Sequence, residues 1–594
     1  MFDPTLLDLP VYAPWSRLTI RRCLLAVAWI VCFYAAWQRL DNAVHMFDRT
    51  DRPPSTVWGW ENGKGNCGHT QIDFGGQWLM GRMVATGQGR HLYDRNHHWK
   101  ALHDGYPRER NAKLAREQSF PAKDRPSGDH TEEHFRTDAE NLMAWTMGGV
   151  NDSKRWGDAG RGLGCAFAGG ANGNPFSAAA SQKLAGEIVD AELIAELDRP
   201  SVGGPLYPPV HGLFYAPLGL ISDAQAAYSA FQILSIVACF FSGWVAQWMS
   251  RGRLAWPLCT AMILAYPGFR PGLDLGQNHA ISLAILLLGW ALVARGRQYA
   301  GGAVWGLLAF KPVWGITFVL VPLLMLRWRI VLAMGLVGCS LALATLPIVG
   351  LDAWFQWLEV GKEATATYNT SKNWIGLSRD LAGIPKRILL DFDKPESERA
   401  DPFAERLGWV LWAVVFTGTV AIYCLRGNRR PTGLGAGFLF LGAYHCCYRF
   451  MYYDVLLSAM AVFALFADPG LIFRTAQFRL VDGALDPFAR KARLYASSFP
   501  VFIVALLLLN DNWLMSVRPV ATIGADYFAV ATTTPDGKGA PRTPTLSATT
   551  DYFHPVDTVL LLVLWAWAGL RLLRDGDSPP STARPGSVAA GLVT

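Results

Sequence analysis

The feature that most constrains this chain is a succession of long apolar runs, which fills most of its length between residues 23 and 573. A run of about 20 apolar residues, or slightly fewer, is long enough to cross the hydrocarbon core of a bilayer. Composition agrees, because hydrophobic residues make up 51% of the chain and charged residues only 17%, below the roughly 25% of a typical soluble domain. The sequence therefore predicts an all-α polytopic membrane protein.

Arginine clusters indicate how these runs thread through the membrane. The Lys and Arg residues lie in short clusters between apolar runs, as the positive-inside rule expects of cytoplasmic loops, so the net charge of +7 does not point to nucleic acid. All clusters between spans fall on the cytoplasmic side only if the short, Pro-interrupted piece 208–221 is re-entrant or interfacial. About twelve crossings are then expected, at 23–40, 226–249, 254–270, 278–294, 298–311, 312–326, 330–349, 406–426, 432–449, 453–467, 497–511 and 556–573.

The same threading predicts a domain organisation. The first span resembles a signal peptide but has no convincing cleavage site after it, so we expect it to be retained. The expected segments are a cytoplasmic N-terminus 1–22, a first transmembrane helix 23–40, an extracytoplasmic loop 41–205 with an insertion at 100–200, a transmembrane catalytic core 206–511 with an outer loop 350–405, an extracytoplasmic loop 512–555, a last transmembrane helix 556–574 and a disordered cytoplasmic tail 575–594.

The cysteines and acidic residues give no metal signature. The ten Cys include no CxxC pair and no metal-ligand spacing, and most lie inside apolar runs, where small core residues are expected. Cys67 and Cys165 share the first extracytoplasmic loop, where they could form a disulfide or remain free. No cofactor is expected, although the sequence leaves a divalent metal open.

Polar side chains gather at the outward ends of the predicted spans. Because the threading puts these clusters in one compartment, we expect them to form a common site. The candidates are Asp73 in the first loop, Gln277, Asn278 and His279 in the turn LDLGQNHA, Lys311 before Pro312, Asn369, Ser371 and Arg379 in the loop YNTSKNWIGLSRD, and His445, Arg449 and Tyr453 in the segment HCCYRFMYYD.

These residue types suit transfer from a lipid phosphate. A charge at bilayer depth costs roughly 2.5–3.5 kcal/mol, so Lys311 should face a polar cavity or an anionic partner. Arg449 and His445 could hold a phosphate by charge-assisted hydrogen bonds, and a nearby carboxylate could act as a general base.

Each candidate also has an ordinary structural explanation, and the residues alone leave these alternatives open. Lys311 could snorkel or cap a kink, and Asp73 could be a plain loop acid. His279 could be hydrogen-bonded locally at a helix start, and Arg449 could form a structural ion pair with Asp454. The Tyr and Trp residues could be interface anchors.

The order of several motifs resembles glycosyltransferase family 87 of the GT-C superfamily. The matching pieces are the first-loop acid in IDFGGQWLMGRMVATGQGRHLYD, the segment YPPVHGLFYAPLGL with Tyr207, the turn GQNHAISLAILL, the hairpin YAGGAVWGLLAFKP and the loop YNTSKNWIGLSRD. They cover about 70–470. The segment HCCYRFMYYD and the insertion at 100–200 depart from the family pattern, so the resemblance says least about phosphate and acceptor binding.

The resemblance implies a GT-C-type fold and a hexosyltransferase, with mannose as the first candidate sugar. The donor would be a polyprenyl-phosphate sugar, and the acceptor a glycan or glycolipid outside the plasma (inner) membrane. Asp73 matches the family's acidic residue and would be the general base of an inverting transfer. Lys311 matches the lysine of the KP motif and would set the charge of the cavity.

Two other classes of protein compete with a transferase. A transporter or flippase of a lipid-linked glycan would tend to show internal repeats and charges at mid-membrane. The sequence shows no internal repeat, and most of its charges lie at the outer span ends. A non-catalytic scaffold could use the large first loop to bind a partner. Loss of transfer on substituting Asp73 would separate the enzyme from both.

Overall fold

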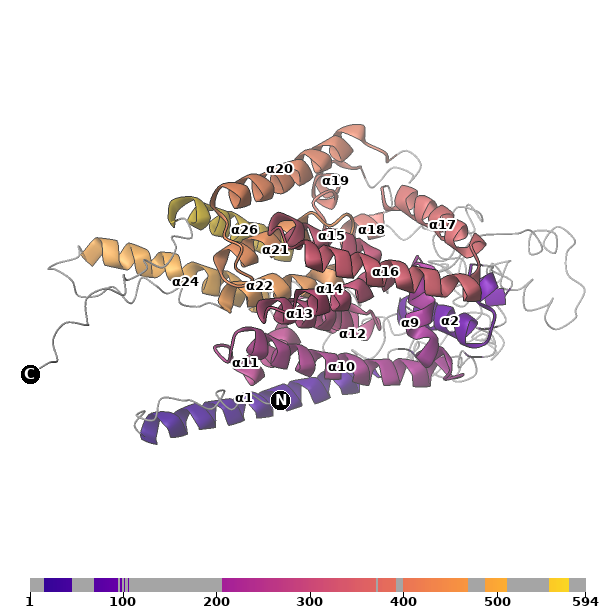
Figure 1. Cartoon of the computed structure of the whole chain (residues 1–594), viewed down its shortest axis with the longest axis horizontal. Coiled ribbons are helices and arrows are strands. Elements are labelled where there is room, and N and C mark those ends of the chain that lie inside the picture. Colours follow the sequence, from indigo (N-terminus) through magenta and orange to yellow (C-terminus); the bar gives the residue numbers. More distant parts are fainter. Residues whose placement is uncertain are drawn as a thin grey trace, which may run out of the picture.

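The computed structural model describes residues 15–44, 47, 69–93, 97–98, 101, 105, 206–369, 372–391, 399–467, 487–509 and 555–575. Figure 1 shows that these residues form a bundle of helices. The described residues contain no β-strand, apart from one isolated bridge between Ser378 and Met451. The predicted all-α fold is therefore confirmed for this part of the chain.

The helices alternate between long rods and short pieces. They are α1 (Trp15–Ala43), α2 (His69–Ala85), α9 (Pro209–Gly219), α10 (Ala224–Met249), α11 (Trp256–Ala265), α12 (Phe269–Asp274), α13 (His279–Ala294), α14 (Gln298–Gly306), α15 (Pro312–Leu324), α16 (Trp328–Val349), α17 (Asp352–Tyr368), α18 (Lys372–Leu377), α19 (Gly383–Leu389), α20 (Pro402–Arg426), α21 (Leu434–His445), α22 (Ala459–Phe466), α24 (Pro487–Leu509) and α26 (Val556–Asp575). The 3₁₀ segments are η2 (Gly89–His91), η3 (Leu307–Phe310) and η5 (Tyr452–Ser458).

Five of these helices contain stretches long and apolar enough to cross a membrane: Arg22–Asp41, Ala224–Met249, Trp328–Val349, Pro402–Arg426 and Val556–Arg574. Each falls on a predicted span, and six shorter apolar helices fall on others. The chain is thus a helical membrane protein, whereas the count of twelve crossings stays a prediction. The predicted re-entrant piece forms α9, whose 11 residues rise only about 16 Å, about half of a bilayer core.

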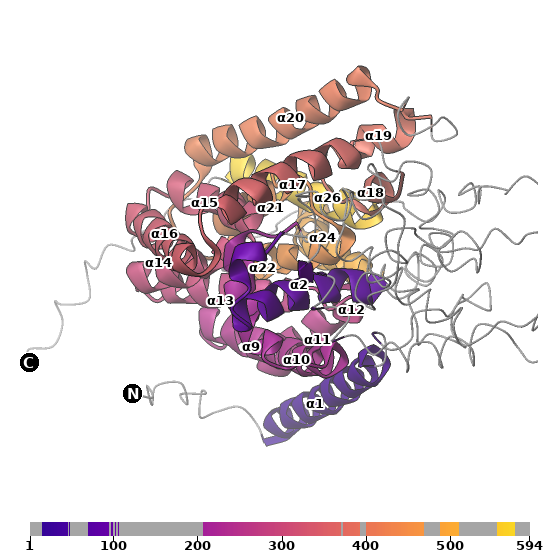
Figure 2. The same ribbon diagram turned by 90° about the vertical axis from the view of Figure 1, so that its right-hand side faces the viewer.

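The outermost helices present apolar side chains to the surroundings. α1 runs along one edge of the bundle beside α10 and α11, and α20 runs along the opposite edge (Figures 1 and 2). Exposed side chains include Leu24 and Ile30 on α1 and Val410 and Val414 on α20. A surface this apolar suits lipid rather than water. Between these edges, fully buried rings such as Trp290 and Trp305, with centroids 5.4 Å apart, form the core.

The arginine-bearing turns gather at one end of α10. Arg295 donates from Nη2 to the carbonyl of Trp248 at 2.7 Å, close to the C-terminal end of α10. Arg253 reaches the carbonyl of Ala467 at 3.2 Å. Near the other end of α10, the hydroxyl of Tyr228 donates to the carbonyl of Asp274 at 2.8 Å. Twenty residues of α-helix rise about 30 Å, so α10 holds these two regions a membrane thickness apart.

α2 and α9 are held together at the end of the bundle where α17 also lies (Figures 1 and 2). A Cβ added to Gly219 would lie 2.2 Å from the backbone carbon of Gly81, so the two helices approach closely because both residues lack a side chain. Arg82 donates to the carbonyl of Gly219 at 3.0 Å, and Trp78 donates to that of Ile221 at 3.1 Å. These contacts fix the position of Asp73, on the same helix.

Candidate active site

Asp73 is half-buried on α2, which is not among the membrane-length helices. Burial raises the pKa of its carboxyl group to about 7, because a carboxylate loses hydration there. The positive charge of Lys311 and a hydrogen bond with the side chain of Gln277 oppose this rise. The carboxyl group is therefore poised between its acid and base forms near neutral pH, as a general base requires.

The turn before α13 packs directly on α2. Gly276 adopts a φ of +67°, and a Cβ there would lie 2.7 Å from the Cβ of Phe74. Gln77 donates to the carbonyl of Gly276 at 3.0 Å, and Asn278 donates to the Oε1 of Gln77 at 3.1 Å. Glycine is therefore needed in this turn both for its conformation and for the close approach. The arrangement brings Gln277 to the carboxyl group of Asp73.

Tyr207 and His211 complete this side of the site. The hydroxyl of Tyr207 donates to the Oε1 of Gln277 at 2.9 Å, and its ring stacks on His211 with centroids 3.9 Å apart. His211 lies between Tyr207 and Tyr215, and one of its ring nitrogens is 3.2 Å from the carbonyl oxygen of Phe310. Burial and the charge of Lys311 lower the pKa of His211 to about 3, so its ring is neutral.

Lys311 forms a buried ion pair. Its Nζ lies 2.6 Å from the Oδ1 of Asp454, and both side chains are largely inaccessible. The same ammonium group is 5.5 Å from the ring centre of Tyr453. The sequence predicts a polar cavity or an anionic partner for Lys311, and the structure places Asp454 as its anionic partner. Snorkelling is excluded by the burial of Lys311, and the carboxylate of Asp454 serves this lysine rather than forming the alternative pair with Arg449.

The two histidines predicted for the site have other surroundings. Both ring nitrogens of His279 lie against backbone carbonyl oxygens, those of Gln277 at 2.9 Å and Phe269 at 3.0 Å, so this ring holds a local turn. His445 is fully buried at the end of α21, with its ring edge-on to Tyr444. The contacts described for these two rings do not include Asp73.

A second cluster is built around Asn369, at the end of α17. Its Oδ1 accepts from the Nζ of Lys386 at 2.6 Å and from the Nη2 of Arg449. Arg449 adopts a φ of 54°, which is uncommon for a residue with a side chain. Two residues predicted from separate loops, Asn369 and Arg449, are thus in direct contact. Burial, followed by the charge of Arg449, lowers the pKa of Lys386 to about 8.

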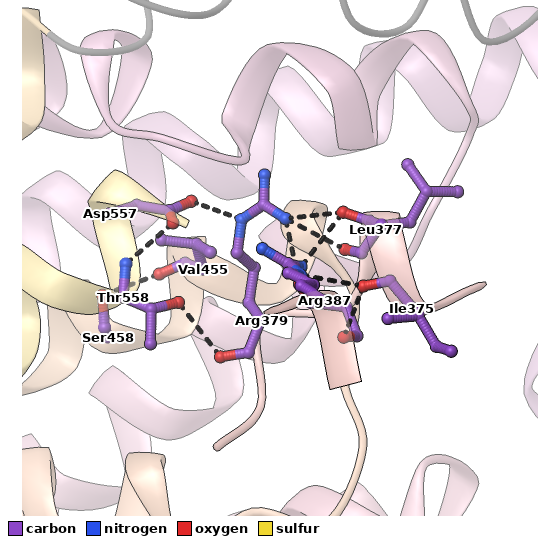
Figure 3. Close-up of polar contacts among 10 residues, drawn as sticks. Ile375, Leu377, Arg379, Arg387, Val455, Ser458, Asp557 and Thr558 are labelled. Atoms are coloured by element: carbon purple, nitrogen blue, oxygen red, sulfur yellow. Dashed lines mark hydrogen bonds and ion pairs between the residues drawn. The ribbon is translucent and has the colours of Figure 1, made fainter. Parts of the chain in front are cut away.

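Arg379 is tied to the start of α26 (Figure 3). Its Nε donates to the Oδ2 of Asp557 at 3.0 Å, and its backbone carbonyl accepts from the hydroxyl of Thr558. Arg387 donates to the carbonyl of Ile375 at 3.0 Å and to that of Ser378. Both guanidinium groups therefore organise the loop before α19. The pKa of Arg387 is lowered to about 9, mainly by burial and next by Arg379.

The structure joins the two clusters through one short segment. The backbone N–H of Arg379 donates to the carbonyl of Phe450 at 2.9 Å, and Ser378 bridges to Met451. This segment begins at Arg449 and ends at Asp454, which forms the ion pair with Lys311. The sequence analysis did not predict Lys386 or the neutral His211 as site residues, although His211 lies in the motif YPPVHG.

Some predicted residues lie outside the described part of the chain. Ser371, Cys67 and Cys165 are among them. Within the residues that the structure describes, no group of three or more His, Cys, Asp or Glu side chains could hold a metal ion. The described site thus offers a carboxyl group, a buried ion pair and several cationic side chains, which suits proton transfer beside an anionic leaving group.

Comparison with known proteins gives a match to a family model. The model of glycosyltransferase family 87 matches residues 206–446, which include the turn with Gln277, the ion-paired Lys311 and the loop with Lys386. Arg449 lies just after the matched range, whereas Asp73 lies well before it. No curated protein and no solved structure matches the chain.

Proposed function

We propose that this chain is a membrane glycosyltransferase that moves a hexose from a polyprenyl-phosphate donor to a glycan or lipid acceptor. The match of residues 206–446 to the model of glycosyltransferase family 87 supports this proposal. Mannose is the first sugar to test. The proposal is supported above all by the half-buried Asp73, whose carboxyl group carries a raised pKa and lies near Lys311 and Gln277.

In the proposed reaction, the acceptor hydroxyl attacks the anomeric carbon from the face opposite the phosphate. Asp73 takes the proton of that hydroxyl. The bond between the anomeric carbon and the phosphate oxygen breaks, and its electron pair leaves with the lipid phosphate. The result is inversion at the anomeric carbon, with the prenyl phosphate as the second product.

The surrounding residues take different parts in this proposal. Lys311 supplies positive charge that favours the ionised form of Asp73, while Asp454 holds Lys311 in place. Gln277 and Tyr207 form the polar wall next to Asp73, where the acceptor sugar would bind. Arg449 is the cation that we assign to the donor phosphate. We do not retain His445 in that role, because its ring is buried against Tyr444.

We further propose that the site opens to the periplasm or exterior of the plasma membrane. The supporting observation is the length of α10, which separates the arginine-bearing turns from the end of the bundle that carries Asp274 and α2. Arginine-rich turns belong on the cytoplasmic side. The outer leaflet is also where a lipid-linked donor would meet an extracytoplasmic acceptor.

A donor panel tests the proposal. The purified full chain is supplied with radiolabelled polyprenyl-phosphate mannose, polyprenyl-phosphate glucose or a nucleotide sugar, together with a membrane glycolipid extract as acceptor. We expect transfer from a polyprenyl-phosphate sugar alone. Asp73→Asn should lower the rate about 10²–10⁴-fold, the usual effect of losing a general base. Asp41→Asn, an exposed carboxylate on α1, is the matched control and should stay active.

Two results would overturn the proposal. An undiminished rate in Asp73→Asn would remove this carboxylate from the chemistry. Movement of the labelled lipid across a vesicle bilayer, with no transfer to any acceptor, would indicate a flippase instead.

A further inference from the structure

Two cations of the second cluster share one neutral oxygen atom. Lys386 on α19 and Arg449 after α21 both donate to the Oδ1 of Asn369. Two cations that contact the same atom repel one another, and the amide oxygen between them carries only a partial negative charge. An anionic oxygen would suit this position better than the amide does.

Further charged side chains surround this pair. Among the described residues they include the cations Arg379 and Arg387 and the buried carboxylates Asp380 and Asp557. Asp557 is engaged by Arg379, and the Oδ1 of Asp380 accepts from the backbone N–H of Gly383 at 2.8 Å. Glu405 also acts on Lys386 but is exposed, so water screens its charge.

A pocket lies beside Lys386 and Arg449. Its polar lining comes from Lys386, Arg449, Ser378 and Asp380, and its apolar lining includes Ile375 and Phe450. The segment that starts at Arg449 leads within a few residues to Asp454, the partner of Lys311. The pocket is therefore adjacent to the ion pair beside Asp73, and its mixed lining offers cations for a phosphate and apolar side chains for a prenyl chain.

We propose that this pocket binds the phosphate of the lipid donor, with Lys386 as a phosphate-binding residue beside Arg449. In the free protein, the Oδ1 of Asn369 occupies the place of a phosphate oxygen and holds the two cations together. This inference rests on the proposed function, since the ligand is the leaving group of that reaction.

The charge of the leaving group gives this site a role in catalysis. The donor is a phosphodiester with one negative charge, whereas the released prenyl phosphate carries about 1.5 to 2. The added charge develops as the bond to the anomeric carbon breaks. Cations fixed at the phosphate therefore stabilise the transition state more than the donor, which accelerates transfer.

Binding to the purified full chain tests the inference. Farnesyl phosphate is the probe, and farnesol and inorganic phosphate separate the contributions of the lipid and of the phosphate. We expect farnesyl phosphate to bind at least about tenfold more tightly than either one, because hydrogen bonds between charged groups are the strong ones. Lys386→Gln should weaken binding about tenfold or more. Lys362→Gln, an exposed lysine on α17, is the matched control and should bind normally.

A second variant covers the case in which Lys386→Gln does not fold. Asn369→Asp puts a carboxylate where the phosphate would bind, so it should weaken farnesyl phosphate binding while strengthening its contacts with Lys386 and Arg449. Normal binding by both variants would overturn the inference. Equal affinity for inorganic and farnesyl phosphate would overturn the assignment to a lipid.

Failure of this inference is distinguishable from failure of the proposed function. Asp73→Asn should bind farnesyl phosphate as the unsubstituted chain does, because Asp73 acts on the acceptor. If Asp73→Asn retains transfer while Lys386→Gln loses binding, the proposed base is wrong and the phosphate site stands. The reverse pattern leaves the base in place and removes the phosphate site.

Discussion

Transfer should fall steeply as the pH is lowered through 7, because Asp73 acts only as a carboxylate. Its pKa of about 7 means that about half of the molecules carry the base form at pH 7 and about a tenth at pH 6. We expect the initial rate at saturating donor to drop about fivefold between pH 7 and pH 6, and about tenfold more by pH 5. An aspartate with the usual pKa of 3.8 would give a nearly flat profile over this range.

The assay follows release of prenyl phosphate at early times, so that the product does not accumulate and titrate. The titrations of His211 and Lys386 can be told apart from that of Asp73, because the pKa of His211 is lowered to about 3 and that of Lys386 to about 8. The double variant Lys311→Gln/Asp454→Asn removes the cation that favours ionised Asp73, so the midpoint should move to higher pH. A flat profile, or a midpoint that moves to lower pH in the double variant, would refute the reasoning.

Three further outcomes are expected from the packing. Lys311→Gln alone should destabilise the fold by about 3–5 kcal/mol, because it leaves Asp454 buried without its partner, whereas the double variant should come close to the unsubstituted chain in a thermal unfolding assay in detergent. Gly219→Val should separate α9 from α2, costing about 1–3 kcal/mol and lowering transfer, and Gly335→Val, which has open space at its Cβ, should do neither; equal behaviour of the two would contradict the close contact. Tyr207→Phe removes one hydrogen bond worth about 0.5–1.5 kcal/mol, so kcat/KM should fall by about two- to tenfold with the unfolding temperature nearly unchanged, and an unaltered kcat/KM would exclude Tyr207 from the site.

The sequence predicts the helical membrane architecture well because apolar length is a local property. The runs that became α10, α16 and α20 each satisfy the length of a bilayer core without reference to any other part of the chain. The short helices were harder to place, since α9 and α12 depend on how they pack. α9, for example, is positioned by the contact of Gly219 with Gly81.

The candidate site was predicted in part, because a motif is also a local property of the sequence. Asp73, Gln277 and Lys311 lie in recognisable motifs, and the structure places them together. The partner of Lys311 was not predictable, because Asp454 is 143 residues away and either Arg449 or Lys311 could have been paired with it. Lys386 had no motif of its own, and only the contact with Asn369 and Arg449 indicates a role for it.

The central claim is that a lipid phosphate leaves from a pocket next to Asp73. A cryo-electron microscopy structure of the Asp73→Asn variant with a polyprenyl-phosphate sugar tests this most directly. We predict density for the phosphate between Lys386 and Arg449, with the anomeric carbon of the sugar facing residue 73. Phosphate density among the arginine-bearing turns around Arg253 and Arg295, or a sugar remote from residue 73, would contradict the account.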